Sequence, residues 1–332
     1  MDTPHHPAPL TADLDSIANQ APTFFDALKR IAKNGIEFFS MKIPERPRIV
    51  GDWFRDSDLG YIFAPRGIGK TWFAHALIAS LTTGKEFGPW KVPSRVPVAL
   101  LDGEMPPGDV QERLLSLGAD PAFLVVLSHQ FLFDEAERSF QLSDPEQRLA
   151  LLVYCREMGI RVLVIDNLSS LSNVSENDND AWTQLGEWLL DFQRSGIAVV
   201  IIHHAGKNGT MRGSSRREDR ASFTISLEDS RERTSTKDGA RFVASFTKHR
   251  YAMAQPETMD WHFSAGENGS TKIEIEAADT DALVYQAIRA GNESCTDIAE
   301  ELGVAPGTVS KAAKRLEGSG RITINGRKYS PT

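Results

Sequence analysis

The segment from Tyr61 to Thr71, YIFAPRGIGKT, constrains the fold more than any other part of the chain. It joins a short apolar run to a glycine-containing turn, and Lys70 and Thr71 then open a segment of helical periodicity. Glycines let backbone amides turn inward around phosphate oxygens, and the N-terminus of the following helix adds partial positive charge. This order predicts a phosphate-binding loop between a strand and a helix.

The residues of this loop have expected contacts. The pattern is G-x-x-x-x-G-K-[ST] except that Ala64 replaces the first glycine, and a small residue still permits the turn. Lys70 would reach the β- and γ-phosphates, and the Thr71 hydroxyl would ligate Mg²⁺. The competing interpretation is an ordinary strand-to-helix turn with an incidental Gly-Lys-Thr. We expect ATP and Mg²⁺ as cofactors, with nucleotide contacts from Ala64, Pro65, Arg66, Gly67, Ile68, Gly69, Lys70, Thr71 and Trp72.

Polar side chains follow three further apolar runs, VALLDGEM, VLVIDN and VVIIHH. Ligands of open α/β sheets bind at the ends of such strands. Glu104 could polarise the attacking water, Asp166 could hold Mg²⁺ through its water shell, and His203 or His204 could sense the γ-phosphate. Adjacent residues of a strand point to opposite faces, so the two histidines do not share a metal ion. Together these residues favour nucleotide hydrolysis.

Short β-branched runs alternate with helical segments over residues 45–278, which predicts an α/β fold with a mostly parallel sheet. The later runs suggest an antiparallel extension of that sheet. The predicted strands are Tyr61–Phe63, Val98–Asp102, Leu124–Leu127, Val162–Asp166, Ala198–His203, Ala221–Leu227, Arg241–Lys248, Asp260–Ser264 and Lys272–Glu276, with helices near 70–82, 108–117, 145–158 and 180–194.

Two smaller regions flank this core. Residues 1–44 read as a tail with one short helix over Thr23–Phe39, and the following IPERPRIVGDWF reads as a linker because of its prolines and glycine. Residues 281–332 contain three short helical patterns, 281–289, 295–302 and 306–317, and end in RITINGRKYS with Asn325-Gly326 as a hairpin turn. This predicts a winged helix-turn-helix domain.

The C-terminal region concentrates positive charge. Ala299 and Leu302 are expected to pack inward, Gly303 to turn, and Val309 and Leu316 to anchor the second helix. Residues 306–332 contain six basic residues and one acidic residue, which favours duplex DNA binding over the alternative role of a protein adaptor. The predicted DNA contacts are Lys311, Lys314, Arg315 and Arg327.

Bulk properties narrow the class of protein. The net charge of −8 excludes a uniformly basic surface but not local basic patches. No apolar run approaches the ~20 residues of a membrane helix, no secretory signal is apparent, and the two distant cysteines suggest neither a disulfide framework nor a zinc site. We therefore expect a cytoplasmic protein without a membrane partner.

With the loop, DGEM, VLVIDN and IIHH in this order, residues 45–255 resemble RecA-like ATPases, and more specifically the RepA-type hexameric replicative helicases of plasmids and phages. The most specific matches are HHAGKNGTMRGSS, residues 203–215, and FTKHR, residues 246–250. The winged helix departs from the minimal helicase of that group, which resembles only the ATPase core.

The resemblance implies a homo-oligomeric ring, a hexamer as in this group, with ATP between subunits. Glu104 would be the catalytic base, and Asp166 the Mg²⁺-associated acid. A neighbouring subunit would supply an arginine finger, Arg212 or Arg250, with Lys248 nearby; we favour Arg212. The segment from Lys207 to Arg220, with five basic and two acidic residues, would face single-stranded DNA through Lys207, Arg216 and Arg217.

Three functions compete. The first is an ATP-driven DNA helicase in the replication of a plasmid, phage or mobile element. The second is a regulatory or recombination ATPase that binds duplex DNA through the winged helix and does not unwind it. The third, a metabolic kinase, explains neither the additional strand-end residues nor the winged helix. The sequence does not separate the first two.

Overall fold

The computed structural model describes residues 22–171, 179–204, 220–229, 239–251 and 256–332. The chain forms two compact units, Met1–Glu45 and Arg46–Thr332, and each is considered separately below. None of the helices in the described ranges combines the length and the apolarity needed to span a membrane.

Within residues 22–45, the described part of the N-terminal unit, there are two helices, α2 (Pro22–Ile31) and α3 (Gly35–Ser40), where the sequence predicted one. The break has a clear cause. The Asn34 side chain accepts a hydrogen bond from the backbone N–H of Glu37, and the Glu37 carboxylate accepts one from the backbone N–H of Asn34. This reciprocal cap starts a new helix at Gly35. Large apolar side chains of this unit remain exposed, notably Ile36 at 85% and Phe39 at 87%.

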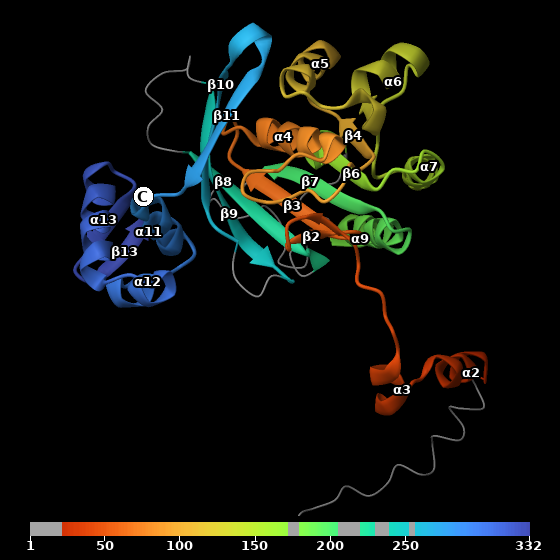
Figure 1. The fold of residues 1–332 in the computed structure, drawn as a ribbon, viewed down its shortest axis with the longest axis horizontal. Coiled ribbons are helices and arrows are strands. Elements are labelled where there is room, and N and C mark those ends of the chain that lie inside the picture. The colour runs from red at the N-terminus through yellow and green to blue at the C-terminus, as the bar shows by residue number, and fades with distance from the viewer. Residues whose placement is uncertain (1–21, 172–178, 205–219, 230–238, 252–255) are drawn as a thin grey trace, which may run out of the picture. The chain divides into compact units, whose positions relative to one another are not determined.

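A nine-stranded sheet organises the second unit, in the order β11-β10-β9-β8-β3-β7-β6-β4-β5 (Figure 1). The pairs from β8 to β5 are parallel, and those from β8 to β11 are antiparallel. The strands are β3 (Leu59–Ala64), β4 (Val98–Asp102), β5 (Leu124–Ser128), β6 (Val162–Asp166), β7 (Ala198–His204), β8 (Phe223–Asp229), β9 (Ala240–His249), β10 (Met259–Ala265) and β11 (Thr271–Ala277).

Helices cover both faces of the parallel part of the sheet. Alternate residues of each strand point to opposite faces, so the apolar runs supply two cores. Ile62, Val164 and Ile202 pack with one cluster, and Tyr61, Leu163 and Ile201 pack with the other. The first face is covered by α4 (Lys70–Thr83) and α5 (Pro107–Ser116), and the second by α7 (Pro145–Glu157), α8 (Leu168–Leu171) and α9 (Asn179–Arg194).

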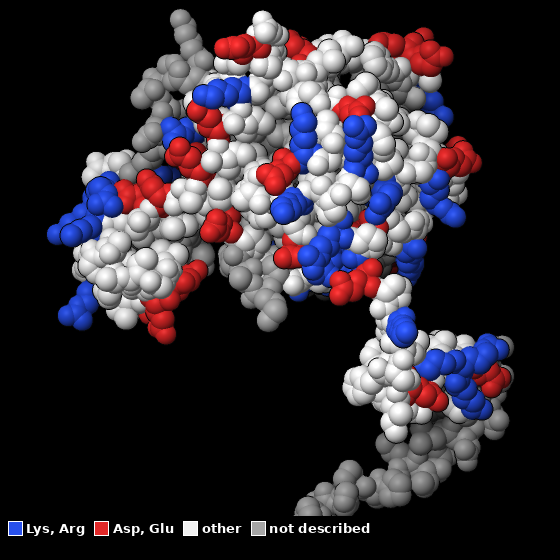
Figure 2. Space-filling model, viewed as in Figure 1, with Lys and Arg blue, Asp and Glu red and all other residues white. Residues whose placement is uncertain are grey.

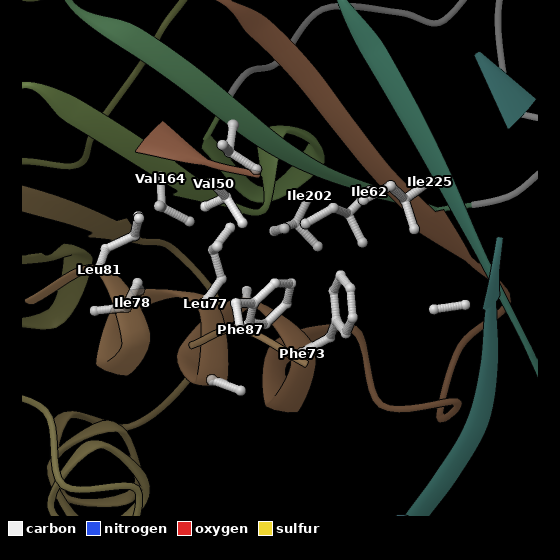
Figure 3. Packing of buried hydrophobic residues seen from close by; sticks show 14 of the residues in the cluster. Val50, Ile62, Phe73, Leu77, Ile78, Leu81, Phe87, Val164, Ile202 and Ile225 are labelled. Carbon is white, nitrogen blue, oxygen red and sulfur yellow. The ribbon is translucent and has the colours of Figure 1, made fainter. Parts of the chain in front are cut away.

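The helix after the phosphate-binding loop lies at the centre of the first core. Along α4, Phe73 lies near Ile62, Leu77 near Val50, and Leu81 near Val164 (Figure 3). The helix is buried over most of its surface, since Ala74, Ala76, Ile78 and Ala79 are also buried. A helix that is apolar on all sides is a core element. The position of the loop at its N-terminus is therefore fixed by packing.

From Arg48 onward the segment predicted as a linker is part of the core, which corrects that interpretation. It forms a small antiparallel hairpin, β1 (Arg48–Val50) with β2 (Phe54–Arg55). Trp53 stacks on Phe54 and contacts Phe223 and Phe246 edge-on, with ring centroids 4.8 and 4.9 Å away. Pro44, Pro47 and Gly51 suggested a spacer, whereas the aromatic pair that follows them, Trp53 and Phe54, supplied the stronger constraint, burial.

Three smaller differences concern local structure. The strand β8 pairs in parallel with β3, so the antiparallel extension begins only at β9. Four short helices were not predicted from the sequence: α6 (His129–Ala136), α8, η1 (Pro121–Phe123) and η2 (Glu267–Gly269). The C-terminal hairpin turns at Gly326 and Arg327, because Asn325 still pairs with Lys328.

The C-terminal residues form the expected three helices and hairpin: α11 (Thr280–Arg289), α12 (Cys295–Leu302), α13 (Pro306–Gly318), β12 (Ile322–Asn325) and β13 (Lys328–Pro331). They have their own apolar core, which includes Ala299, Val309 and Leu316, with Leu302 packed against it. Gly303 ends α12 in the left-handed conformation, with φ of 64°, which a glycine adopts without strain.

The buried hairpin generates a prediction about stability. We expect Phe54→Ala to lower the free energy of unfolding by ~3–5 kcal/mol, because it opens a cavity beneath Trp53 and Phe223. The matched control is Phe39→Ala, since Phe39 is exposed, and its effect should stay within ~0.5 kcal/mol. Urea denaturation measures both values. Equal, small effects would contradict the placement of the hairpin in the core.

Candidate functional site

The phosphate-binding loop connects β3 to α4 and requires glycine at two positions. Gly67 and Gly69 have φ of 79° and 125°. A Cβ atom on Gly69 would lie 2.7 Å from the Phe242 ring and 3.2 Å from the Ala240 Cβ. Both the backbone conformation and the close approach of β9 therefore exclude a side chain at Gly69.

Lys70 is buried at the start of α4 and points back into the loop. Its ammonium donates hydrogen bonds to the carbonyl oxygens of Ala64, at 3.1 Å, and Pro65, at 2.9 Å. Burial lowers the pKa of Lys70, and the nearby carboxylates of Asp166 and Glu104 oppose that effect. The side chain is thus held beside the loop backbone, where a bound phosphate would contact it.

Two buried aspartates lie side by side at the ends of β4 and β6, because Asp102 pairs with Asp166 in the parallel register. Burial raises the pKa of Asp166 to about 7, and a hydrogen bond from Thr71 opposes the rise. Asp102 accepts hydrogen bonds from the backbone N–H groups of Glu104 and Met105, at 3.2 and 2.9 Å. Asp102 thereby shapes the turn that carries the exposed Glu104, and the sequence analysis did not assign it a role.

The residues around Asp166 fit a hydrated magnesium ion. The Oδ2 atoms of Asp102 and Asp166 are buried and have no hydrogen-bond partner within the described residues, as expected of atoms that face a cation's water shell. Within those same ranges no group of three or more His, Cys, Asp or Glu could hold a metal ion alone. Mg²⁺ commonly keeps several waters and takes other ligands from phosphates. Thr71 and Asp166 are the residues that would hold it here.

Asn167 connects the strand ends and was missed by the sequence analysis. Its side-chain amide donates to the Glu104 carboxylate and lies 3.4 Å from Nε2 of His204. Its carbonyl oxygen accepts hydrogen bonds from the backbone N–H and the hydroxyl of Ser170, at 3.0 and 2.8 Å. Asn167 is itself buried. The only sequence signal was its position directly after Asp166 in VLVIDN.

The two histidines occupy different environments at the end of β7. His203 pairs with Phe63 and is buried, and His204 pairs with Ala64 and is half-buried. Nε2 of the His204 ring lies 3.4 Å from the side-chain nitrogen of Asn167. The structure therefore brings His204 into the group formed with Glu104, whereas the sequence left the choice between the two histidines open.

Lys248 and Arg250 lie at the opposite edge of the sheet from the loop of their own chain. Lys248 pairs with Thr224, and Thr224 pairs with Tyr61 of β3. Arg250 follows His249, which pairs with Phe223, and Phe223 pairs in turn with Gly60 of β3. Gly60 lies four residue steps before Ala64, where the loop begins, a distance of ~13 Å along the strand at ~3.3 Å per residue. Neither side chain belongs to the local loop site.

A cavity of about 520 Å³ adjoins the first turn of α4. Trp72 lines it, with the Arg113 guanidinium 4.8 Å from the centroid of its ring. Asp109 and Glu112 of α5 and the tip of the β10–β11 hairpin complete the lining. The cavity thus combines an aromatic face with polar groups beside the loop.

Four predicted site residues lie outside the described residues: Lys207, Arg212, Arg216 and Arg217. The remaining predicted site residues lie within the described ranges. Arg66 and Gly67 are exposed in the loop, whereas Ile68 is buried beneath it.

The predicted DNA-contacting residues of the winged helix differ in their surroundings. Lys311 and Lys314 are exposed on α13, and Arg327 is exposed in the hairpin turn. Arg315, in contrast, donates two hydrogen bonds to the Asp281 carboxylate of α11. Its charge is thereby partly offset. Figure 2 shows basic and acidic side chains interspersed over the displayed face of Arg46–Thr332, so positive charge is local there.

The close approach at Gly69 generates a prediction about nucleotide affinity. We expect Gly69→Ala to weaken binding of a fluorescent ATP analogue by about tenfold or more, because a side chain forces the loop out of its conformation at a cost of ~1–3 kcal/mol. The control is Gly118→Ala, a position with φ of 72° and no neighbour within 4 Å of an added Cβ. Unchanged affinity in Gly69→Ala would show that the loop does not hold the nucleotide.

Comparison with known proteins places this arrangement in a family. Residues 27–210 match the model of the AAA domain, and residues 279–323 match that of the winged helix-turn-helix DNA-binding domain. The crystal structure of a KaiC-like protein from the hyperthermophilic archaeon Pyrococcus horikoshii is similar at 15% identity with a TM-score of 0.48, over 69% of this chain and 99% of that one. No curated protein matches the sequence.

The predicted α/β fold with a mostly parallel sheet and a C-terminal winged helix-turn-helix domain is confirmed. The AAA match covers 184 of the 332 residues, from before the phosphate-binding loop to beyond the two histidines. The chain belongs to the AAA domain family.

Proposed function

We propose that this protein hydrolyses ATP and uses the energy to move on and unwind DNA, as a ring-forming helicase in the replication of a plasmid, phage or mobile element. The observation that carries the hydrolysis is the bridge from Glu104 through Asn167 to His204. It joins a carboxylate beside the loop to the end of a neighbouring strand. Hydrolysis can therefore be communicated to the segment that follows β7.

The residues divide the chemistry among them. Lys70 would place positive charge beside the β- and γ-phosphates, and Thr71 with Asp166 would hold Mg²⁺, which would supply positive charge to the phosphate oxygens. Glu104 orients the attacking water and accepts its proton. Asn167 fixes the Glu104 carboxylate through its amide, and it can respond to the phosphate through His204. Asp102 keeps the Glu104 turn in place through its two backbone hydrogen bonds.

The nucleobase would occupy the cavity beside Trp72. The phosphates lie over the N-terminus of α4, so the rest of the nucleotide leaves the loop near its first turn. The Trp72 ring offers a stacking surface, with the Arg113 guanidinium beside it. A volume of about 520 Å³ is in the range of small-ligand pockets. These features support a purine nucleotide.

An ATP site shared between subunits is supported by the position of Lys248 and Arg250. They lie at the sheet edge opposite their own loop, so only the nucleotide of another subunit could meet them. Arg212, which we favour from the sequence, is the other candidate finger. The exposed Phe24, Ile36 and Phe39 supply apolar surface for self-association, and an arrangement as a hexamer follows from the resemblance.

Two surfaces would bind DNA. The segment containing Lys207, Arg216 and Arg217 would grip single strands in the ring through backbone contacts. The winged helix would bind a duplex through Lys311 and Lys314 on α13 and Arg327 in the wing. The second candidate function, a regulatory or recombination ATPase that binds duplex DNA without unwinding it, is favoured by the winged helix itself.

Strand displacement from a forked duplex distinguishes the two functions. We expect ATP turnover that single-stranded DNA stimulates, together with unwinding of the fork, and we expect Lys70→Ala to remove both through lost phosphate contacts. Lys91→Ala is the control. An ATP turnover rate that single-stranded DNA does not change, together with tight duplex binding that Lys311→Ala weakens, would favour the regulatory ATPase.

Mixing of variants tests the shared site. Arg212→Ala and Glu104→Gln should each be inactive alone, whereas an equimolar mixture should regain activity, since some interfaces then combine an intact Glu104 with an intact finger. The same mixture with Arg250→Ala in place of Arg212→Ala identifies which arginine acts. An arginine finger contributes ~10³–10⁵ in rate, so rescue is easily measured. An absence of rescue at every ratio and with either arginine would contradict a shared site.

A further inference from the structure

The winged helix is attached to the ATPase core by a largely buried ion pair. Arg289, the last residue of α11, lies 2.9 Å from the Glu228 carboxylate of β8. The side chains are only 17% and 10% exposed. Arg321, at the start of the wing, stacks on Tyr285 at 3.8 Å and donates to the backbone carbonyl of Asp229 at 3.5 Å. The end of β8 is therefore the docking point.

This docking point lies beside the phosphate-binding loop. The strand β8 is the direct parallel neighbour of β3, and Ser226 pairs with Phe63. Continuing that register, Glu228 is level with Pro65, the first residue after β3. The residues that hold the winged helix thus sit one strand away from the residues that open the loop.

A second contact joins the docking point to the loop directly. The backbone carbonyl of Asp229 accepts the hydrogen bond from Arg321, and Asp229 pairs with Phe242 across the β8–β9 ladder. The Phe242 ring is the group that leaves no room for a side chain on Gly69. One strand pair therefore carries the winged helix at Asp229 and supports the loop at Phe242.

The ion pair between Arg289 and Glu228 stabilises the docked position of the winged helix. Burial raises the pKa of Glu228, and Arg289 and Arg321 oppose that rise by favouring the charged carboxylate. Removing one partner of a buried pair leaves an uncompensated charge, which is costly. If the winged helix leaves β8, the end of β8 must rearrange to hydrate Glu228. That rearrangement would reach Asp229, Phe242 and Gly69 in turn.

We propose that Arg289 is a positioning residue for the phosphate-binding loop: by docking the winged helix on Glu228, it holds the β8–β9 pair and so keeps Phe242 against Gly69. The inference rests on the proposed function only in that the loop binds ATP. Since coupling between two sites is reciprocal, DNA that alters docking of the winged helix also alters affinity for nucleotide.

A charge-swap experiment tests the proposal. Arg289→Glu and Glu228→Arg should each weaken ATP binding and raise KM by about 5–150-fold, the range of ordinary coupling between sites, with a smaller change in kcat. The double swap restores an ion pair of opposite sense and should recover most of the affinity. The control is Glu293→Arg, which breaks the exposed Lys328–Glu293 pair within the winged helix, away from β8, and should leave KM unchanged.

Two measurements keep the outcomes separable. A fluorescent ATP analogue measures binding directly, so the inference is tested even if the parent protein does not hydrolyse ATP, which would overturn the proposed function alone. Thermal unfolding shows whether a single variant merely unfolds. If it does, Arg289→Met replaces that variant, because methionine keeps a long side chain without the charge. Unchanged affinity in both single variants, or a loss that the double swap does not recover, would overturn the positioning role of Arg289.

Discussion

The parallel register of β3, β7, β6 and β4 is the constraint on which the site depends. It places the last residues of four consecutive neighbours, among them Ala64, Asp102 and Asp166, at one edge of the sheet. Buried apolar residues on both faces of these strands fix that register, because a shift by one residue would exchange the two cores. The polar residues at the edge are positioned by the packing of their apolar neighbours.

The buried polar groups at this edge support one another. The Asp102 carboxylate shapes the Glu104 turn, and Asn167 connects Glu104 to His204. Lys70 offsets the negative charge of Asp166, and the Oδ2 atoms of Asp102 and Asp166 lack partners within the described residues. Such a group is stable when a cation and phosphates complete it. The chemistry of the edge therefore agrees with membership of the AAA domain family.

The sequence predicted the parts of the fold that local pattern determines. The strands Val98–Asp102 and Val162–Asp166 have the predicted bounds, because an apolar run ends at a buried aspartate in both. The hairpin around Trp53 was missed, since prolines suggested a linker and its burial depends on Phe223 and Phe246, far along the chain. The break before Gly35 depends on a cap that apolar spacing does not reveal.

For the site, the strand-end positions indicated Glu104, Asp166 and the histidines, but not how they connect. Asn167 carries no motif of its own. Its role depends on Glu104, which is 63 positions earlier in the chain, and on His204, which is 37 positions later. The link from Arg289 through β8 to Gly69 likewise joins three distant segments, so no sequence period predicts it. These features follow from tertiary packing, which local patterns do not encode.

The account depends on a nucleotide bound between Lys70 and Asp166. The most direct measurement is an experimental structure of the full chain with Mg²⁺ and a non-hydrolysable ATP analogue. The account predicts the γ-phosphate beside the Lys70 ammonium, Mg²⁺ beside the Thr71 hydroxyl with Asp166 in its water shell, and the base beside Trp72. A nucleotide bound elsewhere on the chain, with Lys70 still donating only to the carbonyls of Ala64 and Pro65, would contradict it.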